Sequence, residues 1–416
     1  MRVLQVNKFL YRKGGAEIVC LGLGDALRAA GHEVCYFGMD DPRNVATDDA
    51  DLYPATVDYH ARRGALRKAR EAMRTIYGVQ ARRGMAALLD RRRPAIVHAH
   101  NIYHQLTPSI LAPARDRGIP VLLTLHDLKL QCPVYLFLRD GKLCEECLGR
   151  MPWPVLAHRC KDGGLAESAV LFAEAALHRL LGSYARGVTL FTAPSVFLRE
   201  KMIAGGVPAE RIVHLPNALP FGEDVLAAPY APPPRRDRPR LFWAGRVSPE
   251  KGLGTLLRAV ARCDAPVELQ LAGDGPADAA LRALADELGL RDRVEWLGRL
   301  PRGDIAARVR EADGCIVPSE CYENAPLSVL ESMALGRAPL VSDLGGLPEL
   351  VDDDSGWRFP AGDPAALAAC LAAWAADPSE RERRGRAAHA NARARFSPQV
   401  VLDQTLALYE RALRSA

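Results

Sequence analysis

The chain of 416 residues has no long hydrophobic run. No uninterrupted apolar segment approaches the roughly 18 residues that a membrane-spanning helix needs. The opening residues, MRVLQVNKFL, lead directly into a predicted strand and lack the apolar segment of a signal peptide. These absences favour a cytoplasmic protein. Because 49% of the residues are hydrophobic, the chain can still bury a large core, and its length favours two domains.

Several sequence signatures are also missing. There is no internal repeat at solenoid spacing and no long low-complexity tract. The fingerprint G-x-G-x-x-G is absent after the first predicted strand, where only Gly14 and Gly15 stand, and this weakens an assignment as an NAD enzyme. No aromatic-rich platform or known nucleic-acid module accompanies the basic residues, so no nucleic-acid partner is expected.

Apolar runs alternate with helical patterns in both halves of the chain. Strands that alternate with helices indicate a parallel sheet with helices on both faces. The predicted strands are Val3–Val6, Val34–Phe37, Ile96–Ala99 and Val121–Leu125 in the first half, and Leu241–Ala244, Glu268–Ala272, Val294–Leu297, Ile316–Val317 and Pro339–Ser342 in the second. The predicted fold class is therefore α/β, with two Rossmann-like domains that face each other across a cleft.

The predicted domains are residues 1–220 and 241–395. Residues 221–240 are expected to form a linker, because the stretch from Ala227 contains five prolines and no apolar periodicity. Up to residue 220 the chain has 30 Lys and Arg against 21 Asp and Glu, a net charge of +9, whereas the remainder has 25 against 29, a net charge of −4. This asymmetry indicates different partners for the two domains.

The most informative stretch is residues 319–346, SECYENAPLSVLESMALGRAPLVSDLGG. Pro326 is a favourable first residue for a helix, and Gly336 is a favourable residue just beyond its end. Glu323 is therefore expected in the loop before this helix, and Glu331 more than one turn inside it. The free backbone N–H groups of the first turn can bind a phosphate. A carboxylate on each side suits a sugar nucleotide, which has hydroxyls at both ends.

This stretch resembles the donor-site motif of family-4 glycosyltransferases, the group 1 glycosyl transferases. Two glutamates separated by seven residues are followed by the Gly-Gly-x-Pro-Glu of residues 345–349. The resemblance implies the glycosyltransferase B fold, with a last helix, residues 396–416, that crosses back to the N-terminal domain. It also implies transfer of a sugar, with retention at the anomeric carbon, from a nucleotide diphosphate sugar to an acceptor hydroxyl. A UDP-sugar is favoured over a GDP-sugar, and cell-envelope or exopolysaccharide assembly is the expected process.

A second motif places Arg246 and Lys251 in a loop between a predicted strand and a predicted helix. In isolation these cations are more typical of a solvated basic loop, but the glutamate motif downstream favours a role in neutralising the diphosphate leaving group. The resemblance implies that Glu323 holds hydroxyls of the donor sugar and that Glu331 holds the ribose. The other expected donor contacts are Gly273, Gly298, Arg299, Asn324, Ala325, Pro326, Leu327 and Ser328.

The first domain is expected to bind the acceptor, a glycan or a lipid-linked glycan. Gly15 precedes a predicted helix and allows a close approach of the backbone to the substrate. His126 follows the strand Val121–Leu125 and, by the resemblance, contacts the transferred sugar, although a lone histidine is often structural. No Asp-x-Asp motif stands at a donor-site turn, so no metal or other cofactor is expected for the chemistry.

Two groups of side chains raise the question of a structural metal. His98 and His100 point to one side of a predicted strand, but no third ligand can be identified beside them. Cys132, Cys144, Cys147 and Cys160 lie within 29 residues and include a C-x-x-C. They can hold a structural zinc or remain reduced thiols, and the sequence leaves both alternatives open. The flanking residues resemble a cysteine-containing insertion in a subset of the family.

Residues 61–94 contain eleven Lys and Arg and only two acidic residues. Leu66, Ala69, Met73, Ile76 and Tyr77 fall at helical spacing, which predicts a basic amphipathic helix. Such a helix can rest on an anionic membrane surface, which would make the protein peripheral at the inner face of the membrane, or it can be an ordinary solvated helix. A non-catalytic sugar-nucleotide-binding protein and a sugar-nucleotide epimerase of the same fold are the alternative functions.

Overall fold

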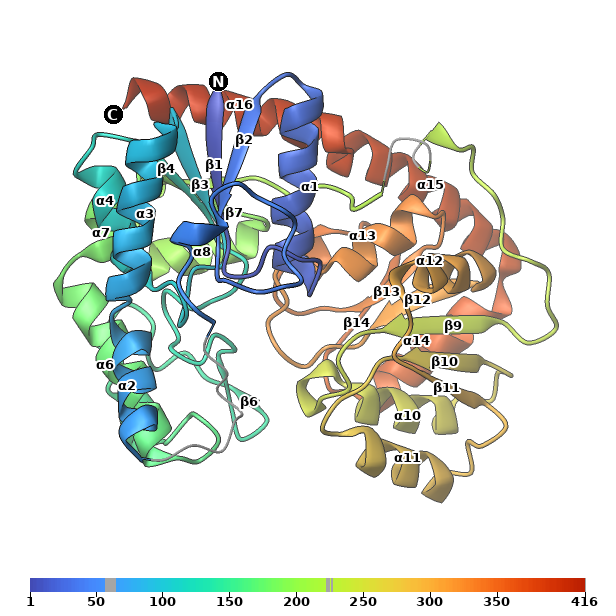
Figure 1. Ribbon diagram of the computed structural model, residues 1–416. Helices are drawn as coiled ribbons and strands as arrows, with labels where there is room; N and C mark the ends of the chain where they lie inside the picture. Colours follow the sequence, from blue (N-terminus) through green and yellow to red (C-terminus); the bar gives the residue numbers. More distant parts are fainter. Residues whose placement is uncertain (57–64, 222–224, 226, 416) are drawn as a thin grey trace. The chain divides into compact units, whose positions relative to one another are not determined.

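The computed structural model describes residues 1–56, 65–221, 225 and 227–415, and for residues 65–68 it describes the backbone alone. The chain divides into two compact units, Met1–Ala218 with Val401–Ala416, and Leu219–Val400. Each unit contains a six-stranded sheet in which all strand pairs are parallel, with helices between the strands (Figure 1). The prediction of an α/β protein with two Rossmann-like domains is confirmed.

The sheet of the first unit has the order β2-β1-β3-β4-β7-β8. Its strands are β1 (Arg2–Val6), β2 (Glu33–Phe37), β3 (Ile96–Ala99), β4 (Val121–Thr124), β7 (Leu190–Ala193) and β8 (Ile212–His214). The three strands β3, β4 and β7 are buried along their whole length, as expected for strands covered on both faces. The strand order reverses between β1 and β3, so the loops after these strands diverge at this point of the sheet edge.

The helices of the first unit are α1 (Gly15–Ala29), α2 (Ala65–Ile76), α3 (Val79–Arg92), α4 (Leu111–Arg115), α5 (Pro154–Ala157), α6 (Leu165–Leu180), α7 (Ser183–Gly187), α8 (Val196–Ala204) and most of α16 (Pro398–Arg414). The last helix, α16, packs on the sheet of the first unit through Leu402, Tyr409 and Ala412. These side chains share a buried cluster with Val3 of β1 and Ile96 of β3. Residues near the end of the chain thus complete the core around its first strand.

The sheet of the second unit has the order β11-β10-β9-β12-β13-β14. Its strands are β9 (Arg240–Ala244), β10 (Glu268–Ala272), β11 (Val294–Gly298), β12 (Gly314–Val317), β13 (Pro339–Ser342) and β14 (Trp357–Phe359). This is the 3-2-1-4-5-6 order of a Rossmann fold, and the switch point lies between β9 and β12. The two loops that carry the predicted donor residues leave the carboxyl ends of these two strands.

The helices of the second unit are α10 (Leu253–Arg262), α11 (Asp278–Glu287), α12 (Arg302–Glu311), α13 (Leu327–Ala334), α14 (Pro364–Ala376) and α15 (Pro378–Phe396). Leu256 and Leu257 of α10 and Leu371 of α14 are buried in one hydrophobic cluster with residues of β9 and β10. Trp374 on α14 is fully buried in the same cluster. A separate cluster joins α13 and α15 through Val329, Met333 and Ala388.

The proline-rich segment that was expected as a linker packs against the second unit. The ring of Tyr230 lies beneath the guanidinium of Arg386 at 4.5 Å, and Arg337 donates a hydrogen bond to the carbonyl of Ala231 at 2.8 Å. Gly336 leaves room for this tyrosine, because an added Cβ atom there would lie 2.8 Å from its ring. Polyproline conformation exposes carbonyl groups, and a buried arginine can use them.

The helix predicted from Leu66 to Tyr77 corresponds to α2, and a second helix, α3, follows it. The break falls at Gly78, where a Cβ atom would lie 2.6 Å from the carbonyl oxygen of Leu106. In the predicted apolar stripe, Met73 is 66% exposed. Across the described residues, no helix is both long enough and apolar enough to cross a membrane.

Candidate functional site

Two loops meet at the switch point of the second unit. Lys251, in the loop after β9, places its Nζ atom 2.6 Å from Oε1 of Glu323, in the loop after β12. Ser319 donates its hydroxyl to the same carboxylate oxygen at 2.7 Å. Burial is the largest influence on the pKa of Lys251 and lowers it, but the charge and hydrogen bond of Glu323, together with Cys321 and Glu250, outweigh burial, so the pKa is raised and the side chain stays charged. The predicted donor residues Lys251 and Glu323 are therefore direct neighbours.

Glycines at two positions allow these loops to approach. Gly252 has φ +71°, and a Cβ atom there would lie 1.8 Å from the carbonyl oxygen of Pro318. Gly345 has φ +65°, and a Cβ atom there would lie 2.6 Å from the carbonyl oxygen of Glu323. The next residue, Gly346, donates its N–H to that same oxygen at 2.8 Å. The glycine pair of the motif thus fixes the backbone of Glu323.

Glu331 lies in the second turn of α13 and forms an ion pair that the sequence reasoning missed. Its Oε1 atom is 2.6 Å from Nη2 of Arg302, the first residue of α12. Burial raises the pKa of Glu331, and Arg302 opposes that shift. The only sequence signal for Arg302 is its place in a turn after β11, because no local spacing relates it to Glu331.

The start of α13 is open to a ligand. Pro326 is the N-cap residue and no side chain caps the helix. The N–H of Val329 donates to the carbonyl of Pro326 at 3.1 Å. The N–H groups of Leu327 and Ser328 precede it, and the positive end of the helix dipole adds to their attraction for an anion. Both side chains are half-buried.

The remaining predicted donor residues border the same strand ends. Gly273, after β10, has φ +150°, and a Cβ atom there would lie 1.8 Å from the carbonyl oxygen of Gly245. Its N–H donates to the carbonyl of Gly298, at the end of β11, at 2.7 Å. Arg246 and Arg299 are exposed, and no residue that the structure describes forms a hydrogen bond or ion pair with either. Between Glu323 and α13, Asn324 is half-buried and Ala325 is buried.

In the first unit, the predicted residue His126 ends a chain of buried polar side chains. Its Nε2 atom is 3.0 Å from Nδ1 of His100, whose Nε2 atom is 2.9 Å from Oε1 of Gln5. Tyr409 of α16 lies 3.4 Å from Nε2 of Gln5 and 2.7 Å from Nδ1 of His98. Gln5, His98, His100 and Tyr409 are at most 1% exposed, whereas His126 is half-buried.

These histidines are electrically neutral near pH 7. Burial lowers the pKa of His126 to about 4 and that of His98 to about 3, and it also lowers the pKa of His100. Lys8 contributes further to the shift at His126. The sequence raised a metal site at His98 and His100, but their ring nitrogens bond to Thr124, Tyr409, Gln5 and His126 instead. The other predicted residue of this unit, Gly15, is the first residue of α1, whose N-terminus has no side-chain cap.

The four clustered cysteines line one small cavity in the first unit. Cys132, Cys144, Cys147 and Cys160 all border it, and all four are free thiols. Burial raises the pKa of Cys132, Cys147 and Cys160, that of Cys147 to about 12. Within the described ranges, no group of three or more His, Cys, Asp or Glu side chains is arranged to hold a metal ion. The zinc hypothesis therefore does not fit the arrangement seen here.

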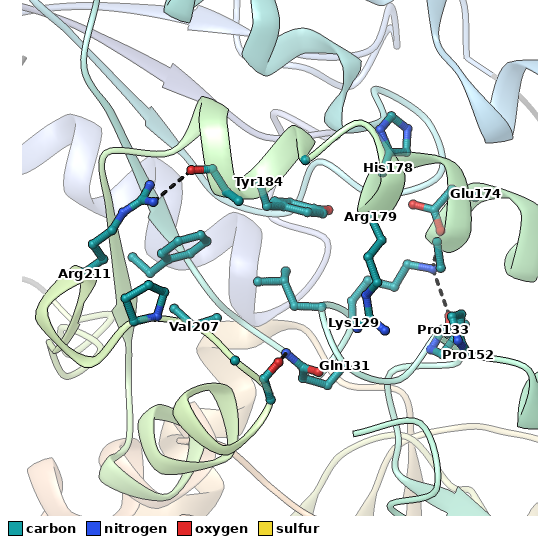
Figure 2. A pocket seen from close by; sticks show the side chains of 18 residues that line it. Lys129, Gln131, Pro133, Pro152, Glu174, His178, Arg179, Tyr184, Val207 and Arg211 are labelled. Atoms are coloured by element: carbon teal, nitrogen blue, oxygen red, sulfur yellow. Dashed lines mark hydrogen bonds and ion pairs between the residues drawn. The ribbon is translucent and has the colours of Figure 1, made fainter. Parts of the chain in front are cut away.

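A larger cavity of about 230 Å³ lies between the loop after β4, α6 and α7 (Figure 2). At its edge Lys129 and Glu174 form an ion pair of 2.8 Å in which both side chains are 2% exposed. Nη1 of Arg179 is buried at this cavity, and no residue in the described part of the chain bonds to it. Because Lys129 already compensates Glu174, the guanidinium of Arg179 gives the cavity an unpaired positive charge, which suits an anionic group.

Comparison with known proteins decides the family. Residues 231–391 match the family of Glycosyl transferases group 1, and residues 14–218 match the Glycosyl transferase 4-like domain. The chain belongs to the group 1 glycosyltransferases. Its residues Arg246, Lys251, Glu323 and Glu331 all lie inside the first of these matches, and the resemblance seen in the sequence is confirmed.

The matched length differs between individual relatives of this glycosyltransferase. It is 30% identical over 336 residues to the alpha-maltose-1-phosphate synthase of Mycobacterium tuberculosis, which covers 76% of this chain and 79% of the relative. It is 33% identical over 202 residues to the phosphatidyl-myo-inositol mannosyltransferase of Mycobacterium leprae, covering 48% of this chain and 53% of the relative. The match thus spans about half the length of this and several other curated relatives.

Solved structures share the fold. The sucrose-phosphate synthase from Thermosynechococcus elongatus has a TM-score of 0.70 at 19% identity and covers 100% of both chains. The HepE protein of Anabaena, solved in complex with UDP and glucose, has a TM-score of 0.65 at 18% identity and covers 99% of this chain and 100% of its own. These likenesses show that this glycosyltransferase has the glycosyltransferase B fold.

Proposed function

We propose that this glycosyltransferase moves a sugar from a nucleotide diphosphate sugar to an acceptor hydroxyl, with retention at the anomeric carbon and no metal ion in the chemistry. The observation that carries the proposal is the Lys251–Glu323 pair of 2.6 Å at the switch point of the second unit, beside the uncapped start of α13. A UDP-sugar is the favoured donor and a GDP-sugar the second. The complex of the related HepE fold with UDP supports this choice.

The two glutamates keep acceptor atoms available for the donor. Oε1 of Glu323 is occupied by Lys251 and Ser319, which leaves Oε2 to accept hydrogen bonds from sugar hydroxyls. Oε1 of Glu331 is occupied by Arg302, which leaves its second oxygen for the ribose hydroxyls. Each ion pair also fixes the direction of its carboxylate, so these acceptors are positioned before the ligand arrives.

The cations of the second unit stabilise the leaving group. When the bond from the anomeric carbon to the phosphate oxygen breaks, negative charge develops on the diphosphate. Arg246 is exposed and unpaired in the described residues, and Lys251 has two N–H groups beyond the one that faces Glu323. Together with the N–H groups of Leu327 and Ser328 they can bind this charge, and the diphosphate then helps to accept the proton of the acceptor hydroxyl on the same face.

The first unit is proposed to bind the acceptor, which is a glycan or a lipid-linked glycan of the cell envelope or of an exopolysaccharide. His126 and the backbone at Gly15 contact the substrate there. The cavity of about 230 Å³ beside Arg179 supports an acceptor that carries an acidic group. Arg179→Gln should raise the KM for such an acceptor and leave the KM for the donor unchanged, with Arg150→Gln, an exposed position on the same unit, as the control.

A donor panel tests the proposed function. The purified protein is incubated with UDP- and GDP-sugars, with and without candidate acceptors, and the products are identified by mass spectrometry and their anomeric configuration by NMR. Release of nucleotide diphosphate that requires an acceptor supports transfer, and addition of EDTA should not reduce the rate. Tight nucleotide binding without any product would support a binding protein instead, and conversion of the donor alone would support an epimerase.

A further inference from the structure

The hydrogen bonds between the buried side chains that end at His126 determine which ring nitrogen of each histidine carries the hydrogen. The carbonyl oxygen Oε1 of Gln5 can only accept, so Nε2 of His100, 2.9 Å away, must donate. A neutral imidazole has one N–H group, and His100 is neutral because burial lowers its pKa. Nδ1 of His100 therefore accepts, and Nε2 of His126, 3.0 Å away, donates to it.

In this assignment, the single ring N–H of neutral His126 donates to His100, inside the protein. A neutral His126 that donates from Nε2 has a lone pair on Nδ1, at the less buried side of the chain. Its lowered pKa, about 4, means that this nitrogen is a weak base that accepts a hydrogen bond without taking the proton near pH 7.

The other arm of the chain is consistent with the same orientation of Gln5. The amide nitrogen Nε2 of Gln5 donates to the hydroxyl of Tyr409 at 3.4 Å, and that hydroxyl donates to Nδ1 of His98 at 2.7 Å. Nε2 of His98 then donates to Thr124 at 2.7 Å. With this assignment, every hydrogen bond of the network has one donor and one acceptor.

A neighbour of the amide favours this direction over its reverse. The thiol of Cys20 donates to Oε1 of Gln5 at 3.9 Å, so a donor other than His100 also faces the carbonyl end of the amide. A Gln5 amide turned by 180° would place its N–H₂ group toward both of them and would reverse every bond in the chain. His126 would then direct an N–H outward.

We propose that Gln5 is a positioning residue that holds His126, through His100, in the Nε2–H tautomer, so that Nδ1 accepts a hydrogen bond from a hydroxyl of the bound substrate. The substrate contact rests on the proposed role of His126 in the transferase. The tautomer itself depends only on the buried chain of the first unit. A substrate in which this hydroxyl is replaced by hydrogen or by a methyl ether loses the bond.

Histidine NMR on the ligand-free protein tests the tautomer. In protein labelled with ¹⁵N-histidine, two-bond ¹H–¹⁵N correlations distinguish Nε2–H from Nδ1–H, and His126→Asn identifies the signal. We expect Nε2–H for His126 at neutral pH, and a mixture of tautomers in Gln5→Met, which keeps the volume and removes the amide. Tyr409→Phe is the control: Gln5 keeps its bond to His100, so the tautomer of His126 should be unchanged while His98 changes.

Kinetics test the contact with substrate. Gln5→Met should lower kcat/KM about tenfold, the effect of one hydrogen bond to the reacting complex. Should Gln5→Met not fold, Gln5→Glu keeps an acceptor for His100 and should retain the Nε2–H tautomer. An Nδ1–H tautomer in the wild-type protein, or an unchanged tautomer in folded Gln5→Met, would overturn the proposal. A changed tautomer with unchanged kcat/KM would remove the substrate contact. The NMR result on the ligand-free protein does not depend on the proposed transferase function, so failure of that function and failure of the tautomer proposal can be told apart.

Discussion

Lys251 and Glu323 neutralise one another through their ion pair of 2.6 Å. Lys251 is 27% exposed and Glu323 is 16% exposed, so an unpaired carboxylate would be costly there. In the proposed function, a bound diphosphate gives the lysine a second anion without removing the first. The exposed Arg246 has no such partner among the described residues and is free to move onto the ligand.

Substitution of either cation should reduce transfer. Arg246→Ala or Lys251→Ala removes a partner of the leaving-group charge, and loss of one preorganised donor costs about 3–4 kcal/mol in the transition state, which is roughly 10²–10³ in kcat. Steady-state kinetics with saturating donor measure the loss. Arg262→Ala, at an exposed position of the same unit, is the control and should leave kcat unchanged. Near-normal turnover in both variants would remove the donor-site assignment.

Residues of the site differ in how well the sequence reveals them. Lys251, Glu323 and Glu331 could be predicted because each lies in a local motif of strand, turn and helix. Arg302 and Gln5 could not, because their partners lie in other elements, Glu331 in α13 and His100 after β3, and only folding brings them together. Local spacing carries no information about such pairs.

The loops after the strands depend on glycine at contacts between loops, and one of these contacts can be tested directly. Gly252→Ala introduces a Cβ atom 1.8 Å from the carbonyl oxygen of Pro318 and also strains a residue at φ +71°. Gly289→Ala is a matched control, since its φ is +69° but nothing lies within 4 Å of the added atom. The Gly289→Ala control should lose only the free energy of unfolding that comes from backbone strain at a positive φ, about 1–2 kcal/mol.

Gly252→Ala should lose more stability than Gly289→Ala and should also weaken UDP binding, because the loop that carries Lys251 must move away from Pro318. Thermal unfolding and isothermal titration measure the two effects. Equal losses of stability in the two variants, with unchanged affinity for UDP, would show that the close approach of these loops does not shape the donor site.

The cysteine loop gives a prediction about metal content. Because burial raises the pKa of Cys132, Cys147 and Cys160, the neutral thiol is favoured in the arrangement observed. We therefore expect much less than one zinc per chain by elemental analysis, and four reactive thiols from this loop after unfolding. One zinc per chain that is lost in Cys144→Ser, but kept in Cys370→Ser, would contradict this and would mean that the sulfur atoms close around the metal when it binds.

Strands with a clear apolar run could be predicted from the sequence, and β3, β10 and β13 have the predicted bounds. The strands β7, β8 and β14 were not predicted. The last two have only three residues each and lie at a sheet edge. In a run of three residues, the alternation of apolar and polar side chains that marks a strand cannot be recognised. The helix α3 was not predicted either, and the close approach of Leu106 to Gly78, just before it, joins distant parts of the chain.

At the scale of the whole molecule, the charge asymmetry remains the strongest feature without a structural explanation. The first 220 residues carry a net charge of +9, and eleven of their Lys and Arg residues lie between positions 61 and 94. Of these, Arg62 and Arg63 lie outside the described residues, as do the side chains of Arg67 and Lys68. The proposal that this segment contacts an anionic membrane surface therefore rests on composition and charge.

Charge reversal tests that proposal. Basic residues near a membrane are each worth about 1 kcal/mol against anionic lipid, so Glu at positions 62, 63, 67 and 68 should reduce binding to phosphatidylserine vesicles by several orders of magnitude in the equilibrium constant. Wild-type binding should also weaken as salt is raised, since the attraction is screened beyond about 10 Å at 0.1 M ionic strength. Affinity for UDP should stay the same, because the donor residues lie in the second unit.

A matched pair of variants separates the position of the charges from their number. Arg62→Glu with Arg63→Glu changes the net charge as much as Arg258→Glu with Arg262→Glu, two exposed positions on α10 of the second unit. If the basic segment contacts the membrane, sedimentation with vesicles should fall far more in the first pair than in the second. Equal losses would indicate a general effect of net charge, and wild-type protein that does not bind vesicles at low salt would exclude the membrane contact. The proposed transferase function would stand under either outcome, because it is argued from Arg246, Lys251 and Glu323.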